Sequence, residues 1–524
     1  MRLLDVLVIL LYLGALVAIG LRTSRRQRTT NEYFVANRSI PGWAIGMSLL
    51  ATIITSVTFI AYPGAAYAGD WRLLTPGIMF VAVIAAIGFV VVPFYRRVVA
   101  MSVYEYFGKR FGPEVRMYSS FAFAMGHFSK MGFVFYLLAL SVGSVTGWNL
   151  TAVIVVLGLI TIFYTLIGGL EAVIWTDVIQ GFVLWTGVAV SIGLLLFSPR
   201  VHAGEVLHLI AANHKTSLGG FHFDLTAGTF WTMVIYGLFF YLQKYTADQT
   251  VVQRYLAAKT DRAALRGIAT GAALCLPAWT AFMFIGSLLW AFYRITGEHL
   301  PASITKPDQI FPHFMVTEMP AGVAGLFLAA LFGAAMSMLA SDLNCLGVII
   351  TEDFYGHFKP RATDSRRLRI GKISVAICGV LAILVAIKLS ATKGAALSLY
   401  YLFTSVVAGG LAGLFLLAFL IPRIGRPQAL IAIAVNLIFT AWATLTMNHG
   451  HTWDLGNWNY PWHEYTIGAV GNTLMFVVGW IASLVAPSAR PNGPTLWDWL
   501  RMRDQPLAEQ SLGEQQYEPV AQSR

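Results

Sequence analysis

About thirteen apolar runs, each close to the length that a helix needs to cross a bilayer, divide this chain of 524 residues. A hydrocarbon core roughly 30 Å thick takes about 20 residues of helix. Hydrophobic residues make up 57% of the chain and charged residues only 12%, which is too apolar for a soluble globule. The sequence therefore predicts an all-α membrane protein with about thirteen transmembrane helices. The runs lie near residues 3–21, 40–68, 74–97, 115–145, 149–168, 172–197, 226–252, 263–294, 319–352, 367–390, 395–420, 427–447 and 464–486.

Basic residues gather in alternate connections between these runs, so membrane topology explains the formal net charge of +11 better than a nucleic-acid partner does. By the positive-inside rule, connections rich in Lys and Arg are cytoplasmic. An odd number of spans then puts the N-terminus outside and the C-terminus in the cytoplasm, where the polar tail 488–524 is expected to be disordered. The residues assigned to the cytoplasmic side are Arg22, Arg25, Arg26, Arg28, Arg38, Arg96, Arg97, Lys109, Arg110, Arg116, Arg254, Lys259, Arg262, Arg266, Lys359, Arg361, Arg366, Arg367, Arg369, Lys372, Arg423 and Arg426.

Two of the apolar runs carry polar interruptions. Residues 48–64 have hydroxyls at their centre and end in Pro63 and Gly64, which predicts a broken helix. Residues 243–249, Gln-Lys-Tyr-Thr-Ala-Asp-Gln, predict a second break. Bare carbonyls at membrane depth are tolerated only where they are buried in protein or line a cavity, and in transporters they hold ions and substrate. The pattern favours a carrier.

Two lysines fall inside predicted spans, where charged groups are costly and indicate function. Lys244 lies ten residues before Arg254, about 15 Å along a helix, which puts it near the midplane. It either forms a structural ion pair with Asp248 at i+4 or contacts substrate or a coupling ion. Lys130 either holds an anionic group of the substrate or pairs with a carboxylate on another helix, and His127 is interpreted as a hydrogen-bonded core histidine.

Ser337 and Ser341 are spaced i and i+4 on one predicted helix, so they share a face. Two hydroxyls alone mean little, because serine in membrane helices often bonds its own i−4 carbonyl. Asp177 lies about six residues inside the start of another predicted span and provides an anionic oxygen. A hard cation such as sodium prefers an all-oxygen shell of this kind. The three residues are therefore candidate cation ligands.

Four segments of the chain resemble the sodium/solute symporter family, and within it the bacterial sodium/sialic acid branch. They are Pro41–Ala44 leading into Ala51–Phe59 and Asp70–Trp71, Gly168–Gln180, Thr246–Tyr255, and Ala334–Asn344 followed by Asp353–Tyr355. The resemblance covers almost the whole membrane portion and implies a LeuT-type core of two inverted five-helix repeats. It divides the chain into a leading helix with a cytoplasmic loop (1–39), the first repeat (40–198), an extracytoplasmic loop (199–225), the second repeat (226–420), two trailing helices (421–487) and the tail (488–524).

The resemblance implies two cation sites. The family's main sodium site combines carbonyls of the broken helix with a carbonyl and a hydroxyl of the helix facing it, which by position are Ala51 and Ile54 on one side and Ala334 and Ser337 on the other. Met338 stands where a further hydroxyl is expected, and a thioether is a poor ligand for a hard cation. The sialic acid branch implies a second cation site at Asp177, Ser337 and Ser341, where Ala340 replaces another serine.

The same resemblance implies a substrate site. Lys130 matches the arginine that meets the substrate carboxylate in the sialic acid branch, and it keeps the charge but loses the bidentate fork. Thr55 and Thr58 retain hydroxyls, while Gly77 replaces a glutamine. Together with Lys244 they form the predicted substrate-binding set. A carboxylated sugar of the sialic acid type or another small organic anion is the first expectation, and a neutral sugar is the second.

The predicted function is sodium-coupled symport of a small organic solute by alternating access in a bacterial inner membrane. A proton-coupled or uncoupled carrier of the same fold stays open as an alternative, because Lys244 or Asp248 could carry a proton. A transporter-like sensor is less favoured, since the tail after Pro487 is too short for a signalling domain. No nucleophile–base pair, metal-ligand cluster or phosphate loop predicts an enzyme. The oligomeric state, a monomer included, is left open.

Overall fold

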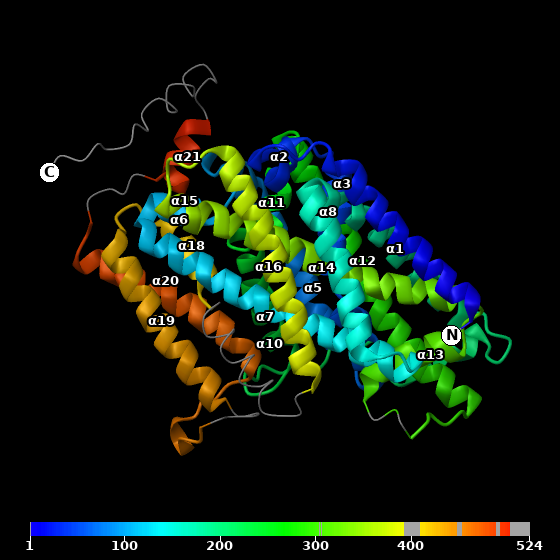
Figure 1. The fold of residues 1–524 in the computed structure, drawn as a ribbon. Coiled ribbons are helices and arrows are strands. Elements are labelled where there is room, and N and C mark those ends of the chain that lie inside the picture. Colours follow the sequence, from blue (N-terminus) through cyan, green and yellow to red (C-terminus); the bar gives the residue numbers. More distant parts are fainter. Residues whose placement is uncertain are drawn as a thin grey trace.

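The computed structural model describes residues 2–302, 304, 306–391, 409–447, 453–488 and 493–503. These residues form helices joined by short connections (Figure 1), and the one β contact among them is an isolated bridge between Ile40 and Ala258. The longer helices are α1 (Leu3–Ser24), α3 (Gly42–Ile53), α4 (Ser56–Ala68), α5 (Thr75–Val98), α7 (Pro113–Thr146), α8 (Leu150–Leu196), α10 (Phe230–Thr246), α12 (Asp261–Thr296), α14 (Val323–Val348), α16 (Asp364–Ala391), α18 (Leu411–Leu420), α19 (Arg426–Thr446) and α20 (Ile467–Val485). The short helices are α2 (Thr30–Val35), α6 (Tyr104–Phe111), α9 (Ala203–Ala212), α11 (Gln249–Leu256), α13 (Ile310–Thr317), α15 (Gly356–Phe358) and α21 (Leu496–Arg503).

Eight helices of the described ranges are long and apolar enough to cross a membrane, and the bent pair α3 and α4 makes a ninth span. The predicted spans 149–168 and 172–197 both lie in α8, whose 47 residues are divided by non-helical backbone at Gly169, between the two predicted runs. The predicted span 395–420 begins outside the described residues, and its described end is α18. The predicted class, an all-α protein that crosses the membrane many times, is confirmed.

Much of the predicted tail 488–524 lies outside the described residues, and α21 belongs to its described part. Trp499 of α21 is buried against Phe94 of α5, with ring centroids 5.9 Å apart. The guanidinium of Arg97 lies 5.0 Å from the Trp499 ring centroid. This segment of the tail therefore docks on the helix bundle.

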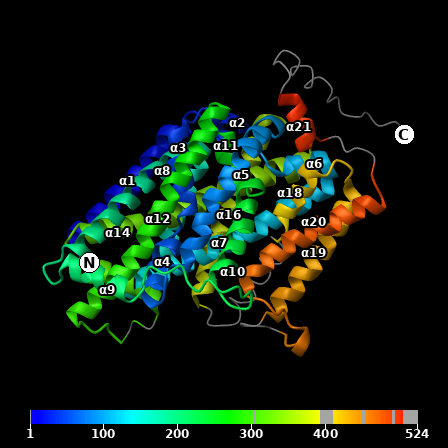
Figure 2. The same cartoon turned by 180° about the vertical axis from the view of Figure 1, so that it is seen from behind.

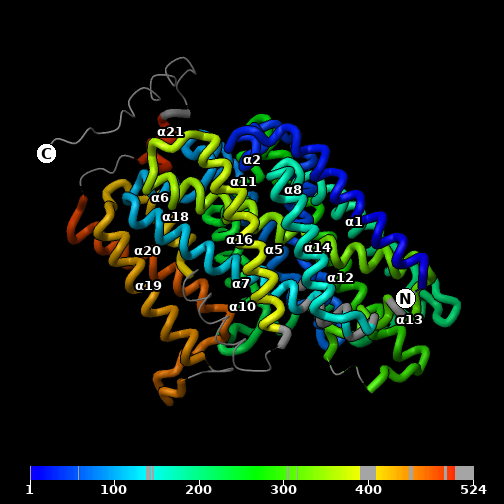
Figure 3. Tube along the Cα trace, in the orientation of Figure 1, coloured from blue at the N-terminus to red at the C-terminus, as the bar shows by residue number. Residues whose placement is uncertain are grey.

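α14 runs through the interior of the bundle, and nearly all of its residues are buried. It contacts α1, α3, α7, α8 and α16. The two opposite views place α1 at one edge of the bundle and α19 with α20 at the other edge (Figures 1 and 2). α2, α6 and α21 gather at the end of the bundle opposite α13 and the N-terminus (Figure 3). A helix enclosed on all sides can present polar side chains to several neighbours at once.

Both predicted helix breaks are present. α3 ends at Ile53, α4 begins at Ser56, and the two helices are bent by 58° relative to each other. The break falls at Ile54 and Thr55, within the hydroxyl-rich stretch, whereas Pro63 lies inside α4. The second break separates α10 from α11, where Asp248 caps α11 by accepting a 2.8 Å hydrogen bond from the Thr250 amide.

α8 changes direction at Gly169, whose backbone (φ 57°, ψ −155°) lies in a region that residues with a Cβ rarely adopt. A Cβ at this position would also lie 2.6 Å from the Tyr33 carbonyl oxygen of α2. The residue thus permits both the bend and the close approach of α2.

We expect Gly169→Ala to lower the free energy of unfolding by about 1–3 kcal/mol, the usual cost of backbone strain at one residue. Gly193→Ala in the same helix is the matched control, because a Cβ there meets nothing within 4 Å. Thermal unfolding of the two variants in detergent measures the difference. Equal midpoints would contradict the requirement for glycine at position 169.

Candidate functional site

A cavity of about 770 Å³ opens beside the α3–α4 break. Its walls come from α4, α7, α10, α12 and α20 as well as from the break itself. The outer part is lined by Tyr465 and by Glu464, which is exposed. All four residues of the predicted substrate-binding set line this cavity, namely Thr55, Thr58, Lys130 and Lys244.

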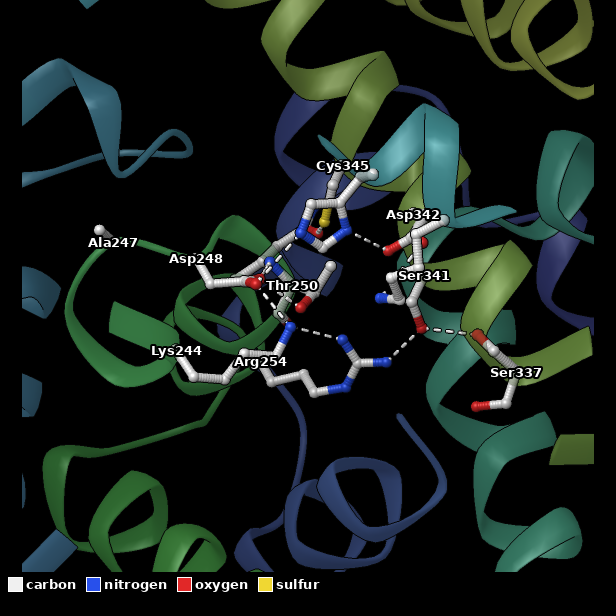
Figure 4. Close-up of polar contacts among 12 residues, drawn as sticks. Lys244, Ala247, Asp248, Thr250, Arg254, Ser337, Ser341, Asp342 and Cys345 are labelled. Carbon is white, nitrogen blue, oxygen red and sulfur yellow. Dashed lines mark hydrogen bonds and ion pairs between the residues drawn. The ribbon is translucent and has the colours of Figure 1, made fainter. Parts of the chain in front are cut away.

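A cluster of five ionisable side chains, the cavity cluster, borders this space. It consists of His127, Lys130, Lys244, Asp248 and Asp342, which come from α7, α10, the α10–α11 break and α14. Figure 4 shows Asp248 and Asp342 facing each other across the gap between their helices, with Lys244 beside Asp248. Charged groups from three helices and one helix break therefore meet beside one cavity, which all of them except Asp342 line.

Lys244 forms the predicted ion pair with Asp248, with its Nζ 2.5 Å from Oδ2, and it also lines the cavity. Lys130 lies farther from its partner: its Nζ is 3.5 Å from Oδ2 of Asp342. Among the described residues that oxygen of Asp342 has no hydrogen-bond partner, and the Lys130 side chain is 32% exposed. The ammonium of Lys130 is therefore held near a carboxylate while it still faces the cavity.

His127 lies between two carboxylates rather than in an ordinary helix core. Its Nδ1 is 2.8 Å from Oδ1 of Asp342, and its Nε2 is 3.1 Å from Oδ2 of Asp248. The expectation that His127 is hydrogen-bonded is confirmed, but the sequence did not identify Asp342 and Asp248 as its partners. The spacing of His127 and Lys130, three residues apart on one helix face, was the available signal.

A second network surrounds Asp177, which is completely buried in α8. Its carboxylate accepts 2.5 Å hydrogen bonds from the hydroxyls of Ser337 and Ser48. Ser341 donates to the Ser337 carbonyl at 2.8 Å. The structure thus brings the three residues of the predicted second cation site together and adds Ser48 of α3.

The guanidinium of Arg254 enters the same network. Its Nη2 lies 3.0 Å from Oδ2 of Asp177 and 2.5 Å from Oγ of Ser341 (Figure 4), and its Nε donates to the Ser48 hydroxyl at 2.8 Å. Arg254 was expected in a connection between spans, whereas it lies in helix α11 and its side chain is fully buried. The depth inferred for Lys244 assumed one unbroken helix ending at Arg254, whereas the break at Ala247 and Asp248 starts a new helix, α11.

The predicted main sodium site draws its ligands from the end of α3 and from α14, two helices that are in contact. Because α3 stops at Ile53, carbonyls of its last turn lack the amide that a continuing helix would supply. Within the described ranges, no backbone amide outside the helices donates to the carbonyl of Ala51 or Ile54. Ala334 and Ser337 are buried on α14. Bare carbonyls beside a buried hydroxyl suit a hard monovalent cation.

The chain is similar to characterised membrane transporters over nearly its whole length. It is 32% identical over 483 residues to the sodium/sialic acid symporter SiaT of Proteus mirabilis, a match covering 91% of this chain and 94% of that protein. It is 30% identical over 485 residues to the sodium/sialic acid symporter NanT of Aliivibrio fischeri, covering 92% of both chains.

Comparison with solved structures finds the same kind of transporter. A solved substrate-bound, outward-open structure of a Na+-coupled sialic acid symporter matches with a TM-score of 0.85 and 30% identity, covering 93% of this chain and 99% of that one. The nucleobase-cation-symport-1 family transporter Mhp1 matches with a TM-score of 0.57 at 16% identity, covering 91% and 98% of the two chains, which is a likeness of fold alone. The expected LeuT-type fold is confirmed.

The family model described as the sodium:solute symporter family matches residues 33–435. That range contains both helix breaks, the cavity cluster and the Asp177 network. This protein is a member of the sodium:solute symporter family, whose coupling ion is sodium and whose cargo is a small solute.

Proposed function

We propose that this protein imports a small organic anion carrying a carboxylate, of the sialic acid type, together with sodium. The observation that carries the choice of an anion is Lys130, whose partly exposed ammonium faces a cavity that Thr55 and Thr58 also line. A carboxylate would meet the ammonium, and hydroxyls of a sugar would find threonine partners. The names of the two sialic acid symporters point to the same class of substrate.

Sodium is proposed to bind at the carbonyls of Ala51, Ile54 and Ala334 and at the hydroxyl of Ser337. In this arrangement the ion joins α3 to α14, and its binding favours the conformation in which these helices are close. Ligation of a further cation by Asp177 and Ser341 stays a prediction, because the Arg254 guanidinium already provides a positive charge to both side chains.

The proposed setting is the inner membrane of a bacterium, with the N-terminus outside and the C-terminus in the cytoplasm. The cavity mouth at Glu464 would then face outward. Two ion pairs at the other end, Arg96 with Asp261 at 2.7 Å and Arg116 with Asp353 at 2.5 Å, would help to close the cytoplasmic side. Transport would proceed as the two proposed repeats, 40–198 and 226–420, move against each other around the cavity.

Uptake of radiolabelled N-acetylneuraminate into proteoliposomes tests this function. Accumulation is expected with an inward sodium gradient and not when choline replaces sodium, because the ion gradient supplies the driving force. Equal uptake in the two buffers would refute sodium coupling. A neutral sugar that competes as well as N-acetylneuraminate would refute the choice of an anion.

Ser337→Ala is expected to raise the sodium concentration for half-maximal uptake about tenfold, since loss of one oxygen ligand worth about 1.4 kcal/mol has that effect. The matched control is Ser374→Ala on α16, where the hydroxyl bonds the Ile370 carbonyl of its own helix at 2.9 Å. Sodium titration of initial uptake rates provides the measurement. An unchanged sodium dependence in the Ser337 variant would exclude its hydroxyl from the site.

A further inference from the structure

Each ring nitrogen of His127 faces a carboxylate from a different part of the fold. Asp342 belongs to α14, and Asp248 belongs to the α10–α11 break. The imidazole also stacks on Phe123 of the same helix, with centroids 3.9 Å apart and planes inclined by 20°. The ring is therefore held in one orientation, with both nitrogens engaged.

The number of protons in this arrangement follows from hydrogen-bond chemistry. A neutral imidazole has one N–H and one bare lone pair, so it can donate to only one of two ionised carboxylates. The other nitrogen would then direct its lone pair at a negative oxygen. An imidazolium donates at both nitrogens and satisfies both contacts.

The two carboxylates have other partners that favour their ionised forms. Asp248 accepts from the Lys244 ammonium at 2.5 Å and from the Thr250 amide and hydroxyl. Asp342 lies 3.5 Å from the Lys130 ammonium. Because each carboxylate has a lysine beside it, the proton that the geometry requires belongs on the imidazole.

Three further ionisable groups near the cluster, Tyr104, Cys345 and Arg254, are engaged elsewhere. The Tyr104 hydroxyl of α6 donates to the Ala247 carbonyl at 3.0 Å, and the Cys345 thiol of α14 donates to Gln253 at 3.0 Å. The Arg254 guanidinium is directed at Asp177. Glu464 lines the outer part of the same cavity, but its side chain is exposed to solvent. The charges of His127, Lys130, Lys244, Asp248 and Asp342 are therefore balanced chiefly within the cluster and by whatever occupies the cavity.

With His127 protonated, the cavity cluster has three positive and two negative charges. One positive charge is left over beside the cavity, and a single carboxylate of a bound solute would neutralise it. With His127 neutral, the cluster is balanced without a solute. Binding of the anion and binding of the proton therefore strengthen each other, as linkage requires.

We propose that His127 is a proton-binding site of the transport cycle and that one proton moves together with each anionic solute. The stoichiometry rests on the proposed function, since it assumes one carboxylate per solute. The imidazolium joins α7 of the proposed first repeat to α14 and the α10–α11 break of the proposed second repeat. Loss of the proton removes one of the two contacts across that interface, so release of solute and proton loosens the two halves together.

Nitrogen-15 NMR of the full-length protein, labelled on histidine and held in lipid nanodiscs at neutral pH, tests the protonation directly. An imidazolium signal is expected that disappears in His127→Gln and persists in His202→Gln, a control at an exposed histidine outside the cavity. A single neutral tautomer at His127 would overturn the proposal. Asp342→Asn gives a second check that retains the histidine, and it is expected to convert the signal toward the neutral form.

A pH-sensitive dye trapped in proteoliposomes tests the movement of the proton without any variant. Sodium-driven uptake of N-acetylneuraminate is expected to acidify the lumen in proportion to the solute taken up. Uptake without acidification overturns proton cotransport and leaves the proposed function standing. An imidazolium signal in a protein that takes up no N-acetylneuraminate supports the proton site and overturns the proposed substrate.

Discussion

Replacing Arg254 by methionine should lower the free energy of unfolding by about 3–5 kcal/mol, the usual cost of removing one partner from a buried ion pair. The Asp177 carboxylate would remain in a completely buried site with only the Ser48 and Ser337 hydroxyls as donors. The cost of an unpaired buried charge exceeds the apolar contacts that methionine restores. Chemical denaturation in detergent, followed by circular dichroism, provides the measurement.

The double variant Asp177→Asn with Arg254→Met is expected to be more stable than the single arginine variant, because no charge is then left unpaired. Arg200→Met serves as the matched control. Arg200 pairs with Glu298 and Glu318, but its side chain is 43% exposed, and exposed pairs contribute about 0–1 kcal/mol. Equal losses at positions 254 and 200 would show that burial of the Arg254 pair has no energetic consequence.

Lys130→Met should raise the dissociation constant for N-acetylneuraminate roughly thirtyfold, which corresponds to about 2 kcal/mol. We place the effect near the lower end of the range for buried charge pairs because the lysine side chain is 32% exposed. Lys130→Arg should retain binding, since it keeps the charge and adds a planar fork that matches a carboxylate. Calorimetric titration of purified protein in the presence of sodium measures the three constants.

Lys359→Met, at an exposed position that does not line the cavity, is the control for loss of a lysine. The thermal unfolding midpoint of each variant is measured as well. A lower midpoint would show that the variant loses stability because Asp342 has lost its partner, whereas an unchanged midpoint with weaker binding indicates a lost substrate contact. A Lys130→Met protein that binds N-acetylneuraminate as tightly as the wild type would remove Lys130 from the proposed substrate site.

Local sequence pattern was sufficient to predict both helix breaks and to give the Lys244–Asp248 pair as one of two alternatives. Hydroxyls crowded into an apolar run and a polar septet at 243–249 are short-range signals, and Lys244 and Asp248 are only four residues apart, on the two sides of the break. The contact between Ser337 and Asp177 was predicted from the family resemblance and not from the local sequence pattern. These features depend on residues close in sequence or on positions already known to face each other.

The partners of His127 and the inward turn of Arg254 could not be predicted in the same way. α14 is buried on nearly all sides and carries apolar residues on every face, so periodicity does not indicate that Asp342 is directed toward α7. The direction of α11 depends on backbone angles at a two-residue break, Ala247 and Asp248, which the composition of the segment does not determine. Contacts between side chains far apart in sequence were therefore not predicted where a helix is buried on all sides or where a new helix begins after a break.

The wall of the cavity has a contributor that stands apart from the two proposed repeats. Glu464 and Tyr465, next to α20, line its outer part, while the proposed ion ligands belong to α3 and α14. Substitutions next to α20 alter the outer wall of the cavity without changing the proposed ion ligands. Selectivity for the solute and coupling to the ion can consequently change independently of each other during evolution. Exchange of the segment next to α20 between related carriers is a direct route to a different solute preference.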